Sequence, residues 1–212
     1  MAKFGAPCTR LAAVLTLTLS AVTCRARRAP IDVRVVFENS WRIGTHHLTD
    51  TDVSVVRRTA MRTMQDAYDG FAVRFTGQAV GDRLIKVEDT PFSPRILLGA
   101  AGLTYPVAKY SSVRFDVLCY AALAAARCED FVGCAAKTRD ELLEGLGRGI
   151  GATAAHELGH QAGFRFALDS PCSDCYDGRS STSADHFFRA KHWSPDALTI
   201  MRRVLPAATA HD

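Results

Sequence analysis

Residues 154–163 of the chain read Ala-Ala-His-Glu-Leu-Gly-His-Gln-Ala-Gly, which places two histidines four positions apart. An α-helix has about 3.6 residues per turn, so residues separated by four positions lie on one face of it. His156 and His160 therefore have the spacing of two ligands to a single zinc ion, and Glu157 lies beside the first of them, toward the open side of the metal. Gly163 is a residue type that commonly ends a helix. The pattern predicts a metal site on a helix that ends near Gly163.

Length and composition restrict the classes of protein to which the chain can belong. The chain has 212 residues, of which 48% are hydrophobic and 23% are charged, as expected for a soluble globular protein with one ordinary domain. The formal net charge is +4, and the basic residues are scattered rather than clustered among aromatic ones. This distribution argues against nucleic-acid binding.

The amino terminus has the pattern of a signal peptide. Lys3 and Arg10 precede an apolar run over residues 11–22, which is shorter than the ~20 residues of a membrane-spanning helix. We predict a signal peptide over residues 1–26 with cleavage after Ala26, a single catalytic domain over 27–212, and a secreted or extracytoplasmic location. Cys24 weakly matches a lipid-anchoring signal. An uncleaved amphipathic tail is the alternative, because positively charged residues directly after the run oppose export.

Cysteine content fits an oxidising compartment. The predicted mature chain holds an odd number of cysteines, so either one thiol is free or Cys24 is retained and paired. The spacing Cys172-x-x-Cys175 suits a metal-ligand pair, a redox pair or disulfide bonding, and disulfide bonding is favoured because no second pair has zinc-ribbon spacing. The remaining cysteines of this region are Cys119, Cys128 and Cys134.

Alternating and helical patterns predict an α+β fold. Strands are expected at residues 31–38, 71–75, 83–88 and 109–119, with a long loop at 90–106 and a short helix or loop tied by a disulfide at 120–134.

A helix is expected from residue 51 to 68, with Asp50 or Thr51 as its cap. Thr138 is expected to cap a second helix. Four glycines at 145, 147, 149 and 151 indicate either a break in that helix near residues 145–149 or close packing against the sheet. Ser194 and Pro195 predict the start of a last helix that ends before Pro206.

The chain resembles the metzincin zinc endopeptidases, and within them the matrixin-like branch. The resemblance rests on His156, Glu157, His160 and Gly163, and on the Ser-Pro-Asp start of the last helix, and it spans about residues 31–206. It implies a zincin/metzincin-like α+β domain with a mixed twisted sheet of four to five strands, a long N-terminal helix, an active-site helix and a C-terminal helix. It also implies Zn²⁺ as cofactor and a protein or peptide substrate, which the strand beside the cleft would be able to bind by β-augmentation.

The third metal ligand departs from the family pattern. Phe166 stands where the family has His or Asp, and a phenyl ring cannot bind zinc. Asp169 is the preferred replacement, because a carboxylate oxygen is an accepted zinc ligand. His186 is the next candidate, with Asp185 or Asp177 in a layout with a distant carboxylate. Asp169 in an ordinary loop turn is the competing interpretation.

The family's methionine turn also has no direct counterpart, and Cys175 falls near the methionine position. Tyr176 follows it and would be able to donate a hydrogen bond to a developing oxyanion. With these departures, the sequence predicts an exported zinc metalloendopeptidase in which Glu157 is the general base. The alternative is a catalytically inactive zinc-binding module that recognises a protein partner. A third interpretation is a structural exported protein in which the motif is accidental.

Overall fold

The structure is a computed structural model that describes residues 28–38, 42–43, 46–78, 80–89, 100–163, 169–179 and 183–208. The predicted signal peptide, Cys24 and Phe166 lie outside the described residues. The expectations for them therefore stay predictions.

A five-stranded mixed sheet forms one layer of the molecule. It contains β1 (Ile31–Phe37), β4 (Val73–Thr76), β5 (Arg83–Glu88), β6 (Gly102–Tyr105) and β7 (Tyr110–Arg114) in the order β4-β1-β5-β7-β6. All neighbouring pairs are parallel except β6 and β7, which are antiparallel. A second, two-stranded sheet pairs β2 (Arg42–Ile43) with β3 (His46–His47). The predicted α+β class with a mixed sheet of four to five strands is confirmed.

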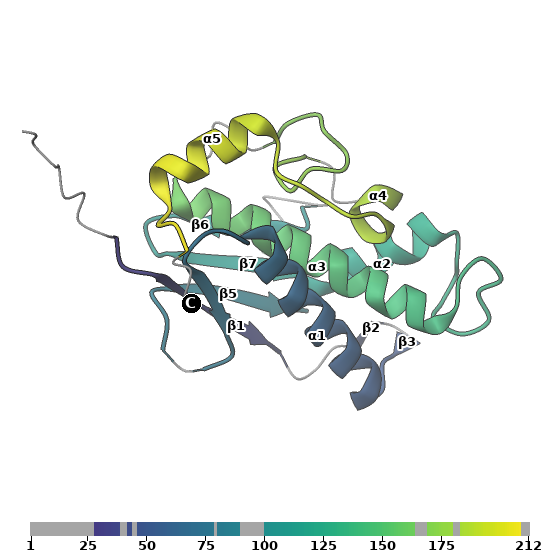
Figure 1. Ribbon diagram of the computed structural model, residues 1–212. Helices are drawn as coiled ribbons and strands as arrows, with labels where there is room; N and C mark the ends of the chain where they lie inside the picture. The colour runs from purple at the N-terminus through teal and green to yellow at the C-terminus, as the bar shows by residue number, and fades with distance from the viewer. Residues whose placement is uncertain are drawn as a thin grey trace, which may run out of the picture.

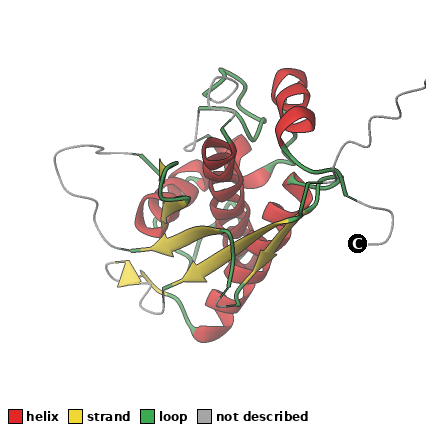
Figure 2. Ribbon diagram, turned by 90° about the vertical axis from the view of Figure 1, so that its left-hand side faces the viewer, coloured by secondary structure: helices red, strands yellow, loops and turns green. Residues whose placement is uncertain are grey.

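Two long helices cover one face of the sheet. Helices α1 (Asp50–Ala67) and α3 (Arg139–Ala162) run side by side along it (Figures 1 and 2). In β1 only Val33 and Val35 are buried, so alternate residues face the core. The apolar stripe of α1 supplies the matching surface with Val56, Ala60 and Met64, which are fully buried.

The cap of α1 lies one or two residues before the predicted position. Thr49 accepts a hydrogen bond from the backbone of Asp52, and the Asp52 carboxylate accepts from the backbone of Thr49. Asp50 and Thr51 are therefore in the first turn instead of at the cap. Asp52 also pairs with Arg139 at the start of α3, and the pKa of Asp52 falls to about 2 chiefly through that hydrogen bond. The same carboxylate thus joins the starts of both long helices.

Helix α3 is continuous, so the predicted break near residues 145–149 is wrong. Its glycines do mark close packing, but against helices α1 and α4 and not against the sheet as expected. A Cβ at Gly147 would lie 2.7 Å from the carbonyl oxygen of Val56, and one at Gly151 would lie 2.6 Å from that of Ala60. Both oxygens belong to the backbone of α1. The cost of about 1 kcal/mol per helical glycine is offset by an approach that no larger residue permits. The predicted cap Thr138 is present, with Glu141 as its reciprocal partner.

The strand predicted over 109–119 ends early. Strand β7 stops at Arg114 and helix α2 (Phe115–Ala126) begins directly after it. Phe115, Leu118, Cys119 and Ala122 have helical spacing and are all buried, so packing of this stripe overrides the local alternation. A disulfide joins Cys128 to Cys134 after the helix, and Cys119 is a buried free thiol.

Two short helices complete the described chain. Helix α4 (Ala184–Phe188) was not expected, whereas α5 (Pro195–Val204) begins as predicted, with Ser194 accepting from the backbone of Ala197. Strand β6 lies within the predicted loop 90–106 and forms the edge of the sheet. Among the described residues, no helix is both long enough and apolar enough to cross a bilayer.

Candidate metal centre and cleft

The last two turns of α3 carry the two histidines. Gly163 ends the helix in a left-handed conformation with φ of 90°, and its backbone N–H donates to the carbonyl oxygens of the preceding turn. Such a cap lets the helix stay regular up to its end. His156 and His160 therefore project from one face, and their Nε2 atoms lie 3.1 Å apart.

The ring of His156 has a fixed orientation. Its Nδ1 lies 2.9 Å from the carbonyl oxygen of Tyr176. A carbonyl only accepts hydrogen bonds, so Nδ1 carries the proton and Nε2 presents its lone pair. Burial lowers the pKa of His156, and the hydrogen bond to Tyr176 opposes that shift. A neutral imidazole held through its other nitrogen is the usual form of a histidine ligand.

Asp169 lies beside the two histidines. Its Oδ1 is 3.8 Å from Nε2 of His156, and its backbone is left-handed with φ of 64°. One donor atom from each of His156, His160 and Asp169 lies within 4.8 Å of the others. In a tetrahedral zinc site, donors about 2.0–2.2 Å from the metal are about 3.3–3.6 Å apart. Two imidazoles and a carboxylate at these separations fit a zinc ion with one open position.

The other predicted ligands point elsewhere. His186 is on α4, and its Nε2 lies 2.9 Å from the carbonyl oxygen of Gly149 and 3.1 Å from the hydroxyl of Thr153. Burial lowers the pKa of His186 to about 3, so the ring is neutral. Asp185 pairs with Arg189, and Asp177 accepts a hydrogen bond from the backbone of Ser194. None of these side chains joins the group formed by the histidine pair and Asp169.

Glu157 is held against the edge strand β6. Its side chain is buried, and Oε2 accepts a hydrogen bond of 2.5 Å from the hydroxyl of Thr104. Gly102 lies against the same carboxylate, and a Cβ there would overlap its Oε1. Burial raises the pKa of Glu157 to about 7; the hydrogen bond from Thr104 opposes the shift and the charge of Asp169 adds to it. A carboxyl group with a pKa near neutrality suits general acid–base chemistry.

Two hollows meet at this centre. One, of about 320 Å³, extends along β6 past Thr104 to Pro106 and His160. The other, of about 220 Å³, extends toward α4 and the loop that contains Tyr176. Both are lined by His156, Glu157 and Asp169. His156, Glu157 and Asp169 therefore lie where the two hollows of this cleft meet, His160 lines the larger one, and Gly102 of the edge strand lines both.

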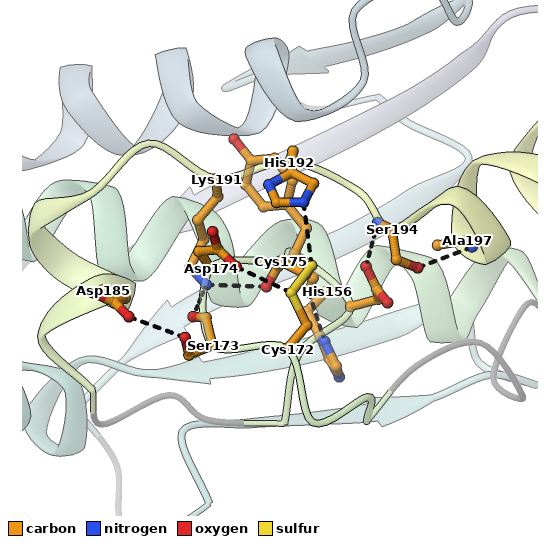
Figure 3. Close-up of a disulfide and its surroundings, with 12 residues drawn as sticks. His156, Cys172, Ser173, Asp174, Cys175, Asp185, Lys191, His192, Ser194 and Ala197 are labelled. Atoms are coloured by element: carbon orange, nitrogen blue, oxygen red, sulfur yellow. Dashed lines mark hydrogen bonds between the residues drawn. A yellow bond between two sulfur atoms is a disulfide. The ribbon is translucent and has the colours of Figure 1, made fainter.

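A small disulfide loop supports the opposite wall. Cys172 and Cys175 are bonded to each other, and Lys191 donates to the carbonyl oxygens of Ser173 and Cys175 (Figure 3). Together with Asp174 and His192, the two cysteines form a second group of closely spaced metal-binding side chains within the described residues. In the closed disulfide neither sulfur is a thiolate, and metal binding by cysteine requires one. The loop instead fixes the Tyr176 carbonyl that orients His156.

Tyr176 contributes to this centre through its backbone. Its ring packs against Trp193 with centroids 5.3 Å apart. Burial raises the pKa of its hydroxyl to about 12, and the charge of Asp66 on α1 adds to that shift. The side chain therefore packs in the core between α1 and α5, whereas the hypothesis of an oxyanion donor requires its hydroxyl beside the histidine pair.

Gly102, Thr104 and Ser111 are the site residues that local sequence patterns missed. They lie on β6 and β7, 46 to 55 positions before Glu157, and they contact it only because the sheet edge packs against α3. The sequence held one indication of this neighbourhood. Gln161 follows Glu157 by four residues, so the two side chains lie on the same face of the helix.

Comparison with known proteins supports the fold. No protein-family model matches the chain, and no curated protein sequence matches it. Among solved structures, the crystal structure of archaemetzincin (amzA) from Methanopyrus kandleri is similar, with a TM-score of 0.50 and 14% sequence identity over 82% of this chain and 94% of that one. The chain has a zincin-like fold. At this identity the similarity concerns the fold, and the matrixin-like assignment stays an expectation.

Proposed function

We propose that this chain is an exported zinc-dependent metallopeptidase that hydrolyses peptide bonds. The observation that carries the proposal is the convergence of His156 and His160, with Nε2 atoms 3.1 Å apart, beside the buried Glu157 in a cleft next to an edge strand. His156, His160 and Asp169 are the proposed zinc ligands. The zincin-like fold is consistent with this chemistry.

Each part of the site has its own role in the proposed reaction. When bound, zinc supplies a Lewis acid that polarises the scissile carbonyl and lowers the pKa of water. Glu157 takes a proton from the attacking water and passes it to the leaving amine. Among the described strands, β6 is the outermost of the sheet and pairs only with β7. Main-chain pairing of an extended peptide with its outer edge would align the substrate along the cleft.

A chelation experiment tests the metal requirement. Zinc-loaded protein should hydrolyse a denatured protein substrate, lose that activity when zinc is removed with a chelator, and regain it when zinc is added back. Activity that survives complete removal of the metal, as measured by elemental analysis, would contradict the proposal.

Export is tested separately, by sequencing the amino terminus of the protein recovered outside the cytoplasm of the expressing cell. Cleavage after Ala26 is expected.

A second candidate function is an inactive zinc-binding module that recognises a protein partner. The observation that favours it is Asp169: this proposed third ligand is 52% exposed, and the family's usual ligand position is occupied by Phe166. Stoichiometric zinc binding without hydrolysis of any member of a peptide library would favour the module over the peptidase.

A further inference from the structure

We propose that Thr104 is a positioning residue for Glu157. It is the last donor in a series of hydrogen bonds that runs from Gln161 through Ser111 and Thr104 to the Glu157 carboxylate. The chain begins and ends on α3 and crosses the two strands at the sheet edge. The inference rests on the proposed function and adds to it a set of residues that hold the general base in place.

Distances along the chain are short throughout. The amide Nε2 of Gln161 lies 2.7 Å from Oγ of Ser111, which lies 2.7 Å from Oγ1 of Thr104. Thr104 Oγ1 in turn lies 2.5 Å from Oε2 of Glu157. The first two links are within the normal range for their donors and acceptors, and the third is shorter than a usual hydrogen bond between oxygens.

Donor chemistry gives the chain one direction. The amide nitrogen of Gln161 only donates, so Ser111 accepts from it and has its own proton left for Thr104. Thr104 then directs its proton to Glu157, because an ionised carboxylate only accepts. Oε2 is the nearer acceptor at 2.5 Å, and the backbone oxygen of Glu157 lies 3.0 Å from the same hydroxyl. The competing acceptor for Ser111, the backbone oxygen of Glu157, is farther away at 3.5 Å. The same amide nitrogen of Gln161 also donates to the carbonyl oxygen of Leu84 on β5, which anchors the start of the chain.

Burial makes the arrangement rigid. Ser111 is fully buried, and Gln161 and Glu157 are each 6% exposed. Water therefore does not easily replace a lost partner of these three side chains, whereas Thr104 is half-buried and lines the cleft. Gly102, two residues before Thr104, lies against the other oxygen of Glu157, and a Cβ there would overlap it. The carboxylate is thus bound through Oε2, and the strand leaves space for Oε1.

Fixing the carboxylate matters because catalysis depends on its position. A displacement of about 1 Å in a reacting group costs about 10²-fold in rate, and general base catalysis as a whole contributes about 10²–10⁴-fold. Thr104 acts through Glu157 and does not bind the substrate in this account. Its loss should therefore lower kcat and leave KM and the zinc content unchanged.

The test uses three variants of the full chain loaded with zinc. Thr104→Val removes the hydroxyl with little change of shape, Thr104→Ser keeps it, and Thr199→Val makes the same change at an exposed residue of α5 away from the cleft. For Thr104→Val we expect kcat to fall roughly 10- to 100-fold, with KM and bound zinc within about twofold of wild type. Thr104→Ser should recover most of the activity, and Thr199→Val should be as active as wild type. A Thr104→Val protein with unchanged kcat would overturn the inference, as would a fall that Thr104→Ser does not rescue.

A second readout needs no activity. In the metal-free protein, the denaturant midpoints of Thr104→Val, Glu157→Gln and the double variant form a thermodynamic cycle. We expect the midpoint shift of the double variant to differ from the sum of the single shifts, because the two side chains share one interaction. Additive shifts would overturn the inference. Wild-type protein that binds zinc and hydrolyses nothing would remove the proposed function and this inference with it, whereas an active wild type with an equally active Thr104→Val removes the inference alone.

Discussion

At the level of single residues, Asp169 carries the most weight in the proposed zinc site. Its carboxylate lies 3.8 Å from His156, yet the residue has a left-handed backbone and about half of its side chain is exposed. An Asp in a left-handed turn is common on structural grounds alone. Its proximity to His156 therefore suggests a zinc ligand, whereas its left-handed backbone suggests an ordinary turn residue. The affinity of the protein for zinc distinguishes the two roles.

Replacing Asp169 by Ala should weaken zinc binding. Loss of an outer partner of a metal ligand costs about 10–100-fold in affinity, and loss of a ligand should cost at least as much. Competition titration of zinc with a chromophoric chelator measures the change. Asp174→Ala is the matched control, because Asp174 lies in the same loop region outside the histidine group. Equal affinity in the Asp169→Ala and Asp174→Ala proteins would contradict ligation by Asp169.

His186 gives a pH dependence whose sign follows from its burial. Its pKa in the folded protein is about 3, below the ordinary value of 6.5, because burial disfavours the charged ring. Stability contributed by the neutral ring is present above pH 6.5 and is lost as the pH falls from 6.5 toward 3. Between these pH values the unfolded state binds one proton more than the folded state. The free energy of unfolding therefore falls by about 1.4 kcal/mol for each pH unit of acidification.

Chemical denaturation of the metal-free protein as a function of pH measures that slope. His186→Gln keeps a donor for the carbonyl oxygen of Gly149 but does not titrate, so its slope between pH 6.5 and 3 should be smaller than that of wild type by this amount. The same variant should keep its affinity for zinc. Identical slopes in the two proteins would show that His186 is not the buried neutral group described above.

At the level of elements, α3 shows what local sequence reveals. The caps at Thr138 and Ser194 were predictable because a cap is formed by residues three positions apart. The continuity of α3 was not, because the role of its glycines depends on α1, more than 80 residues earlier. The short strand β6 was missed for a similar reason: its four residues show no alternation, and pairing with β7 makes them a strand.

The glycines of α3 give a prediction at this level. Gly151→Ala should destabilise the protein by about 1–3 kcal/mol, because the new Cβ meets a backbone oxygen of α1 that cannot move away. Gly145→Ala is the matched control in the same helix, since the atoms nearest its Cβ belong to the partly buried side chain of Phe188 and not to the backbone of a neighbouring helix. Denaturant unfolding of both variants compares the costs. A Gly151→Ala protein that is no less stable than Gly145→Ala would contradict the close packing of α1 on α3.

At the level of the whole molecule, the candidate site joins three parts that are distant in sequence. Helix α3 supplies the histidines and Glu157, the edge strand β6 supplies Thr104 and the space at Gly102, and Tyr176, directly after the disulfide, supplies the carbonyl oxygen for His156. Figure 1 shows α3 and β6 in the fold, and Figure 3 shows His156 beside the disulfide. The sequence motif identified the first part because its residues are neighbours along one helix. The other two depend on the sheet order and on the return of the chain after α3, which no local pattern contains.

The central claim is that Glu157 acts as a base beside a zinc ion held by its neighbours. Its most direct test compares the zinc-loaded wild-type and Glu157→Gln proteins for turnover of a denatured protein substrate, with zinc measured in the same samples. The account predicts a loss of at least about 10²-fold in kcat with equal zinc in both proteins. Rapid hydrolysis by a zinc-loaded Glu157→Gln protein would contradict it.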